Sequence, residues 1–465
     1  MRRKFPNLNL APKISCTGLW NNDWQLNQKL EWAKQNQHLC ILPFVNRVIN
    51  VEFDGQRDPK KQKTFLRNSC CCNLITDTDP TVIEQVKQSI VQGQTNANCQ
   101  RCYDSENQTG SSERTMALLS ESPEQINKFL NTTTVDHSVI GIKFSNLCNL
   151  ACRSCSPTFS SKYAQVHGLQ IPQELVNDIA DNPTVWDDIT QSISQKLANH
   201  ATINLSLFGG ESLIQPGALR LIDWLNQHSF SHRVILNVTT NFTNLETRVV
   251  KQFDQFKAVY LYASIDSVEE NYNYVRYPGN WDQIEKNLQQ ILPQLSDGSI
   301  ALTVQPLWSL NNIFYIVDYL DWWHAWLKST TLDQVVIKNV TMFRPFHLTV
   351  QNLPLEYRNQ LQNLLMQATD HVIFKHYQHE SLSNFLYGLI EFLSTDQKIY
   401  DQFELFLFDT ARHDRATNSQ MQIGNKKFYE LLSTKHQQLL KKLQLDLDVK
   451  SLPTQQQHIY QQLPL

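Results

Sequence analysis

The chain has 465 residues, and its 41 Lys and Arg against 44 Asp and Glu give a formal net charge of −3. Hydrophobic residues make up 41% of the sequence, which excludes a disordered chain and leaves ample material for a buried core. The charge gives no global electrostatic reason to bind nucleic acid or an acidic membrane surface. Because no apolar run has the length of a signal peptide or a membrane span, we expect a soluble, cytoplasmic protein without a membrane partner.

The N-terminal part of the chain is distinguished by its cysteines, since all ten lie in the first third of the sequence. Residues 1–35 are polar and are interpreted as an extension. Residues 36–135 form a cysteine-rich α+β domain, with a strand predicted over residues 48–53 and a helix over residues 80–92. In a cytosolic protein, clustered cysteines are typical of metal binding or catalysis and not of disulfide bonds.

Residues 136–346 alternate between apolar, strand-like runs and helix-like segments. The predicted strands are residues 139–144, 203–208, 234–239, 259–265, 300–304 and 335–340. The predicted helices are residues 183–197, 218–226, 245–256, 281–292 and 311–327. Six strand–helix repeats predict an α/β fold with a parallel sheet, a partial TIM-like (β/α)6 barrel whose functional loops follow the strands. Residues 347–465 are predicted to be mainly helical.

Three cysteines follow the first predicted barrel strand directly, namely Cys148, Cys152 and Cys155, with the spacing C-x3-C-x2-C. Three thiolates on one loop can hold three corners of an iron–sulfur cube, which normally takes four cysteine ligands. One iron is then left open for a bound molecule. The alternatives are three buried thiols or a zinc site, although structural zinc prefers four ligands in paired C-x2-C knuckles.

Polar motifs follow the later strands in chain order. They are Gly209-Gly210-Glu211, Thr239-Thr240-Asn241, Ser264-Ile265-Asp266, and Gln305 followed by Asn311. Together with the cysteine loop, this order resembles the radical S-adenosylmethionine (radical SAM) enzymes. The resemblance implies that S-adenosylmethionine is bound by Gly209, Gly210, Glu211, Thr239, Asn241, Ser264, Asp266, Gln305 and Asn311. The alternative is that the strand-end polar groups only satisfy backbone ends.

The upstream cysteines Cys40, Cys70, Cys71, Cys72, Cys99 and Cys102 precede Glu106, Gly110, Ser112 and Arg114. This series resembles the auxiliary-cluster module called a twitch, or shortened SPASM, domain, placed here before the barrel. The resemblance implies that ligands of an auxiliary iron–sulfur cluster come from these six cysteines; a four-thiolate zinc site is the alternative. Near the other end, residues 408–412 resemble a Leu-Asp-x-x-Arg segment of the same enzyme group.

The resemblance implies a radical SAM oxidoreductase or transferase. A [4Fe-4S] cluster, reduced by an external electron donor, cleaves S-adenosylmethionine to a 5′-deoxyadenosyl radical, which abstracts a hydrogen from the substrate. By analogy the substrate is a peptide, with a small molecule as the alternative. No further catalytic residue is assigned. Two other functions stay open: a non-catalytic zinc- or cluster-bearing scaffold that binds a partner peptide, and a nucleotide- or tRNA-modifying radical enzyme.

Overall fold

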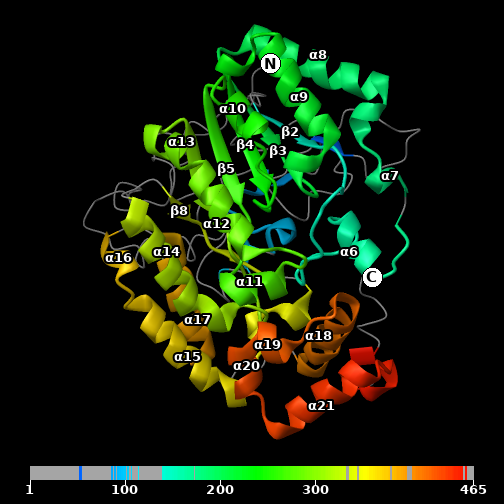
Figure 1. Cartoon of the computed structure of the whole chain (residues 1–465), viewed down its shortest axis with the longest axis vertical. Coiled ribbons are helices and arrows are strands. Elements are labelled where there is room, and N and C mark those ends of the chain that lie inside the picture. Colours follow the sequence, from blue (N-terminus) through cyan, green and yellow to red (C-terminus); the bar gives the residue numbers. More distant parts are fainter. Residues whose placement is uncertain are drawn as a thin grey trace.

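The computed structural model describes residues 52–54, 85–86, 88–90, 92–100, 102–103, 106, 114, 139–171, 173–330, 335–342, 345–376, 380–394, 401–453 and 456–457. The predicted ligands Cys40, Cys70, Cys71 and Cys72 lie outside the described residues, so their roles stay predictions. In Figure 1 the main sheet and its helices form the upper part of the molecule, and the C-terminal helices form the lower part.

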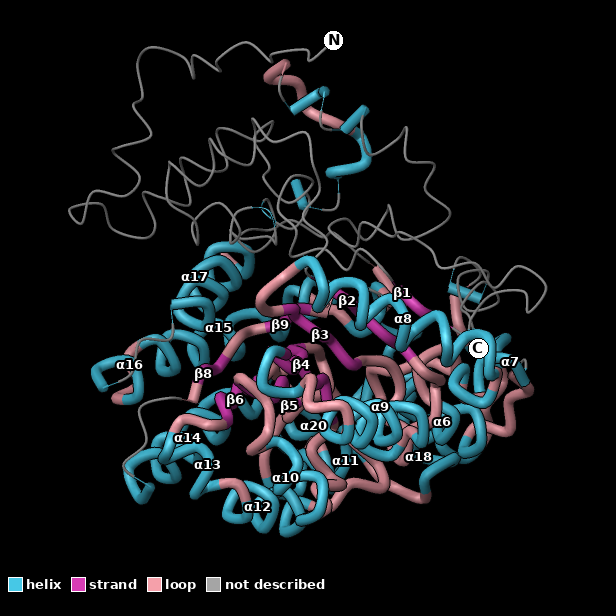
Figure 2. The backbone as a smooth tube through the Cα atoms, turned by 90° about the horizontal axis from the view of Figure 1, so that it is seen from above, coloured by secondary structure: helices cyan, strands magenta, loops and turns pink. Residues whose placement is uncertain are grey.

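A sheet of parallel strands, in the order β1-β2-β3-β4-β5-β6-β8, forms the centre of the fold. Six of its strands confirm the six predicted from the sequence: β2 (Val139–Lys143), β3 (Ile203–Leu207), β4 (Val234–Thr240), β5 (Ala258–Ala263), β6 (Ile300–Val304) and β8 (Val336–Ile337). Figure 2 shows the strands following one another along an arc. The arrangement is that of a partial barrel.

The remaining strand, β1 (Glu52–Asp54), pairs in parallel with β2, so that Asp54 lies opposite Lys143. These residues belong to the segment 36–135 that is predicted to be the cysteine-rich domain, and they pair with the edge of the main sheet. The reason is that β2 would otherwise expose a row of unpaired backbone groups. A separate pair, β7 (Leu307–Trp308) and β9 (Val340–Thr341), was not predicted, because two-residue strands show no periodicity.

Five crossover helices confirm the predicted helical segments: α8 (Pro183–Asn199), α9 (Pro216–Gln227), α10 (Thr247–Phe253), α12 (Trp281–Gln290) and α14 (Ile316–Thr330). The start of α8 follows from local chemistry, since Asn182 accepts hydrogen bonds from two helical amides and Pro183 fits the first turn. Four short helices were not predicted: α6 (Ser161–Val166), α7 (Gln173–Val176), α11 (Glu269–Val275) and α13 (Leu292–Asp297).

The inner strands have one apolar face and one polar face. Apolar side chains at alternate positions, such as Leu205 and Leu236, are fully buried in the core that includes the crossover helices. On the opposite face, Thr239, Tyr262 and Thr303 lie side by side in register, and Thr239 is exposed. A parallel sheet covered on both faces is typically apolar throughout, so the polar face marks the side available to a ligand.

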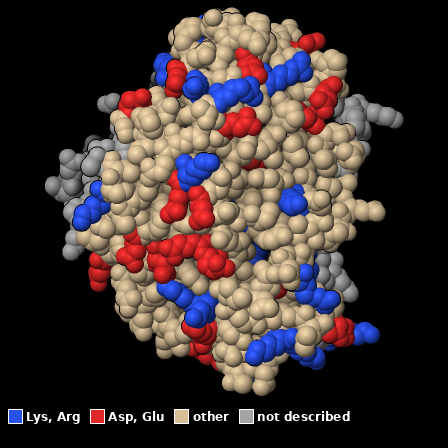
Figure 3. Space-filling view, in the orientation of Figure 1, with Lys and Arg blue, Asp and Glu red and all other residues tan. Residues whose placement is uncertain are grey.

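Helices dominate the described residues after 350. They are α15 (Leu355–Thr369), α16 (Ile373–His376), α17 (Glu380–Leu393), α18 (Phe403–Thr417), α19 (Met421–Gly424), α20 (Lys426–Leu431) and α21 (Thr434–Leu445). Helix α18 packs against α21, and α15 against α17. Among the described helices, none combines the length and apolar character needed to cross a membrane. Figure 3 shows acidic and basic side chains interspersed over one face, most of which is uncharged.

Candidate functional site

Three thiols, those of Cys148, Cys152 and Cys155, lie on the loop that follows β2, and Cys152 is buried. Burial is the largest cause that raises the pKa of each thiol, to about 12 at Cys155. The neighbouring thiols raise the pKa of Cys152 and Cys155 further, so the three sulfurs lie within electrostatic reach of one another. As free thiols they are protonated at pH 7, and binding them as thiolates requires a thiophilic group.

Hydrogen-bond donors surround two of the sulfurs. The amide of Leu150 lies 3.5 Å from Cys148 Sγ, Asn241 Nδ2 lies 3.9 Å from the same sulfur, and Arg276 Nη1 lies 3.7 Å from Cys152 Sγ. Donors to cysteine sulfur are typical of iron–sulfur sites, where they tune the reduction potential. Three thiols with these donors fit a cube that has one open iron. Within the described residues, no three His, Cys, Asp or Glu side chains converge as ligands of a single metal ion.

The Gly-Gly-Glu turn packs directly against the cysteine loop. The φ values of Gly209 and Gly210 are +84° and +47°, a region that favours glycine. A Cβ on Gly210 would lie 2.2 Å from the carbonyl oxygen of Leu147, which also accepts a hydrogen bond from the amide of Glu211 at 2.8 Å. Gly210 allows a close approach of the loop that carries Cys148, whereas a Cβ on Gly209 would meet the side chain of Lys143.

Replacing Gly210 by alanine is therefore expected to displace the cysteine loop. The Cβ meets backbone, which cannot swing away as a flexible side chain would. We expect at least a halving of iron bound per chain at this loop, measured after anaerobic reconstitution. Gly168 is the control, because its φ is also positive (+62°) but its Cβ would meet nothing within 4 Å. Equal iron loss in Gly168→Ala and Gly210→Ala would contradict the contact with Leu147 as the cause.

Glu211 is completely buried at the end of β3. Its Oε1 accepts hydrogen bonds from the amide of Leu213 at 3.0 Å and from Thr240 Oγ1 at 2.8 Å, and its Oε2 accepts one from the amide of Asn241. Burial raises the pKa of Glu211, and these hydrogen bonds oppose the shift. The carboxylate thus joins the ends of β3 and β4. Strand alternation places Thr240 and the predicted cofactor contact Thr239 on opposite faces of the sheet, so Thr240 is the threonine that reaches Glu211.

The other predicted strand-end residues differ in their surroundings. Asn241 Nδ2 donates to Asn149 Oδ1 at 2.8 Å, beside Cys148. Ser264 and Gln305 are half-buried, and their amides bond to carbonyls of neighbouring strands. Asn311 is buried, and its Nδ2 has no hydrogen-bond partner among the described residues. The structure therefore brings Asn241 to the cysteine loop, while the backbone amides of Ser264 and Gln305 take part in strand pairing.

Asp266 is completely buried and paired with a residue that the sequence analysis missed. Its Oδ2 accepts from Arg276 Nε and Nη2, both at 2.8 Å, and its Oδ1 accepts from the amide of Leu307 at 2.9 Å. Arg276 in turn reaches Cys152. The sequence offers one indication of this pair. Arg276 is the single charged residue among the apolar and aromatic residues 274–277, and an arginine that is buried there needs a carboxylate partner.

Two upstream cysteines, Cys99 and Cys102, fall within the described residues, and Cys99 is buried. Burial raises the pKa of Cys102 to about 11, a backbone hydrogen bond from Arg114 lowers it, and Glu106 and Cys99 raise it further. Glu106 and Arg114 are both fully buried and form a two-pronged pair, with contacts of 2.9 and 2.6 Å. The four described residues of the series that resembles a twitch domain, Cys99, Cys102, Glu106 and Arg114, therefore lie close together.

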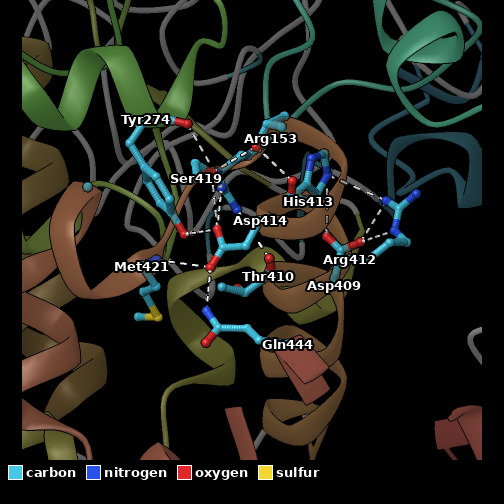
Figure 4. A network of polar contacts seen from close by, with 12 residues as sticks. Arg153, Tyr274, Asp409, Thr410, Arg412, His413, Asp414, Ser419, Met421 and Gln444 are labelled. Atoms are coloured by element: carbon cyan, nitrogen blue, oxygen red, sulfur yellow. Dashed lines mark hydrogen bonds and ion pairs between the residues drawn. The ribbon is translucent and has the colours of Figure 1, made fainter. Parts of the chain in front are cut away.

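A second polar cluster joins α18 to α6, and Figure 4 shows its α18 members Asp409, Arg412 and His413. Burial alone would raise the pKa of Asp409. Arg412 and nearby histidines outweigh this effect and hold the pKa of Asp409 well below its usual range. Arg412 also donates to Tyr163 Oη at 2.7 Å. His167 Nε2 lies 3.1 Å from His413 Nδ1, and burial together with Arg412 lowers the pKa of His167 to about 4. The segment that resembles Leu-Asp-x-x-Arg thus forms an interface with the helix after the cysteine loop.

Stability is expected to fall as the pH drops from about 6.5 towards 4, partly through His167. The unfolded chain binds a proton at this histidine below its ordinary pKa, while the folded protein keeps the ring neutral, so acid favours unfolding. His167→Gln should make the pH dependence of the melting temperature shallower in this interval. His232, which is exposed, is the control. The same slope in His167→Gln and wild type would contradict the expectation.

No protein-family model matches the chain, and no curated protein matches it. Among solved structures, "Native anSMEcpe with bound AdoMet" is similar at 14% identity over 52% of this chain and 63% of that chain, with a TM-score of 0.36. "Crystal structure of Streptococcus suis SuiB" is similar at 13% identity over 58% and 54%, with a TM-score of 0.35. The chain thus spans less than two thirds of either structure. Likeness at this level does not place the chain in a family.

Proposed function

We propose that the protein is a radical SAM enzyme. The observation that carries the proposal is the loop with Cys148, Cys152 and Cys155, which lies at the ends of parallel strands against a Gly-Gly-Glu turn. Three thiols with hydrogen-bond donors to their sulfurs suit a [4Fe-4S] cluster with one open iron. When bound, that cluster supplies the electron that cleaves S-adenosylmethionine for hydrogen abstraction.

The residues of the chain have three tasks in this proposal. The three cysteines hold the cluster, and Asn241 and Arg276 donate hydrogen bonds to their sulfurs. Glu211 holds the strand ends together. The proposed contacts to S-adenosylmethionine are the remaining residues of the strand-end motifs: Gly209, Gly210, Thr239, Ser264, Asp266, Gln305 and Asn311. The unpaired Nδ2 of Asn311 supports its place in this set.

A peptide is the proposed substrate. Along one face of the sheet, uncharged polar side chains lie in register, namely Ser206 beside Asn237, and Thr239 beside Tyr262 and Thr303. Such groups both donate and accept hydrogen bonds, as a peptide backbone does. The proposed reaction requires an external electron donor. The upstream cysteines, which include Cys99 and Cys102, are proposed to bind an auxiliary iron–sulfur cluster, with zinc as the alternative.

The test is production of 5′-deoxyadenosine from S-adenosylmethionine by the anaerobically reconstituted protein with dithionite. Release of 5′-deoxyadenosine by wild type, and none by Cys148→Ala, is the expected result. A protein that carries the cluster but releases no 5′-deoxyadenosine would instead be the scaffold. Zinc without iron, even after reconstitution, would also exclude the enzyme.

A further inference from the structure

We propose that Arg153 and Asp414 form a buried anchor that positions the cysteine loop for cluster binding, so that the C-terminal helices are part of the cluster site. The inference rests on the proposed function. Arg153 lies in the loop between Cys152 and Cys155, and Asp414 lies on α18, 261 residues further along the chain. Figure 4 shows the two side chains meeting at the centre of a polar network.

The guanidinium of Arg153 is held by hydrogen bonds and by a contact with an aromatic ring. Its Nη2 donates to Asp414 Oδ1 at 2.6 Å and to Ser419 Oγ at 2.8 Å, and its Nε donates to the carbonyl of Tyr274 at 3.0 Å. The guanidinium carbon lies 3.5 Å from the centre of the Tyr274 ring. Only 3% of the side chain is exposed. This combination of fork and stacking contacts requires arginine, because lysine has no planar fork.

The carboxylate of Asp414 collects donors from several elements. Its Oδ1 also accepts from Tyr274 Oη at 3.0 Å, and its Oδ2 accepts from the amide of Met421 at 2.9 Å and from Gln444 Nε2 at 2.8 Å. These donors come from α11, α19 and α21. The position of Arg153 is therefore set jointly by α11 of the barrel and by the C-terminal helices α18, α19 and α21.

The anchor acts on the sulfurs through the backbone. The amide of Arg153 donates to the carbonyl of Val275 at 2.9 Å, so both ends of the residue are held. Cys152 is the preceding residue and Cys155 follows two positions later. A cube accepts ligands only at fixed separations, so a shift of Arg153 moves two of them. A buried ion pair is a poor device for stability alone, whereas it can specify one geometry among several.

The test compares conservative variants by iron per chain after anaerobic reconstitution and by the electron paramagnetic resonance spectrum of the reduced cluster. Asp414→Asn keeps the size of the side chain and removes its charge. We expect it to lose at least half of the iron that Cys148→Ala/Cys152→Ala/Cys155→Ala loses, and the remaining signal to change shape. Arg153→Lys, which keeps the charge, should retain more iron than Arg153→Gln.

Two controls separate positioning from general destabilisation. Arg415→Gln changes an exposed residue on the same helix and should leave iron and spectrum unchanged. Leu225→Ala, at a fully buried position of α9, should lower the melting temperature without changing the spectrum. A normal iron content and spectrum in Asp414→Asn would overturn the anchor alone. Wild-type protein with no more iron than the triple cysteine variant would overturn the proposed function and, with it, the anchor.

Discussion

Replacing Cys148, Cys152 and Cys155 together by alanine is expected to lower the iron content from about eight to about four atoms per chain and to abolish 5′-deoxyadenosine formation. The three thiols lie on one loop with hydrogen-bond donors at their sulfurs, so the triple variant removes every protein ligand of one cube. The four remaining irons would belong to the auxiliary cluster. Iron, acid-labile sulfide and zinc per chain, measured on protein purified without oxygen, give the result.

The measurement also decides the nature of the auxiliary site. About four irons with one zinc in wild type would keep the radical site and make the upstream site structural. Cys99→Ala/Cys102→Ala is the matched variant, since it removes two upstream thiols and leaves the loop of Cys148 intact. Unchanged iron in the triple variant would contradict cluster binding by Cys148, Cys152 and Cys155.

Arg276→Gln is expected to lower the free energy of unfolding of the cluster-free protein by about 3–5 kcal/mol, because it leaves the buried carboxylate of Asp266 without its cation. Among the described residues, the carboxylate of Asp266 then keeps the hydrogen bond from the amide of Leu307. In the reconstituted protein the same change removes a positive charge next to Cys152, so the midpoint potential of the cluster should become more negative. Urea denaturation and a redox titration measure the two effects.

The exposed pair of Arg248 and Asp223 provides the control for this prediction. Its atoms lie 3.6 Å apart and its side chains are 57% and 36% exposed, so Arg248→Gln should cost no more than about 1 kcal/mol. Arg276→Gln/Asp266→Asn should recover part of the stability, because the uncompensated charge is gone. Equal losses in Arg248→Gln and Arg276→Gln would show that Arg276 does not neutralise Asp266.

Patterns that repeat over neighbouring residues were read correctly from the sequence. The six parallel strands of the barrel and its five crossover helices follow from hydrophobic periodicity, which depends on the local chain. The short helices and β7 were not predicted, because segments of a few residues show too little hydrophobic periodicity. The start of α14 is Ile316 and not Asn311, since a 3-10 turn over Ile313–Tyr315 precedes it.

The candidate site was predicted in part. The thiols of Cys148, Cys152 and Cys155 and the contact of Glu211 with Asn241 lie together, as the order of motifs along a parallel sheet indicates. The hydrogen bond from Thr240 to Glu211 was not predicted from the sequence. The metal and cofactor roles of these residues stay predictions.

By itself the sequence determined a parallel α/β fold and the placement of a cysteine loop after its first barrel strand, because both depend on residue order and short-range periodicity. Only the tertiary structure decided which buried charges meet. Arg276 pairs with Asp266, and Arg153 pairs with Asp414, which lies 261 residues further along the chain. A buried charge must be paired, but any carboxylate satisfies that requirement, so the packed chain alone identifies the partner.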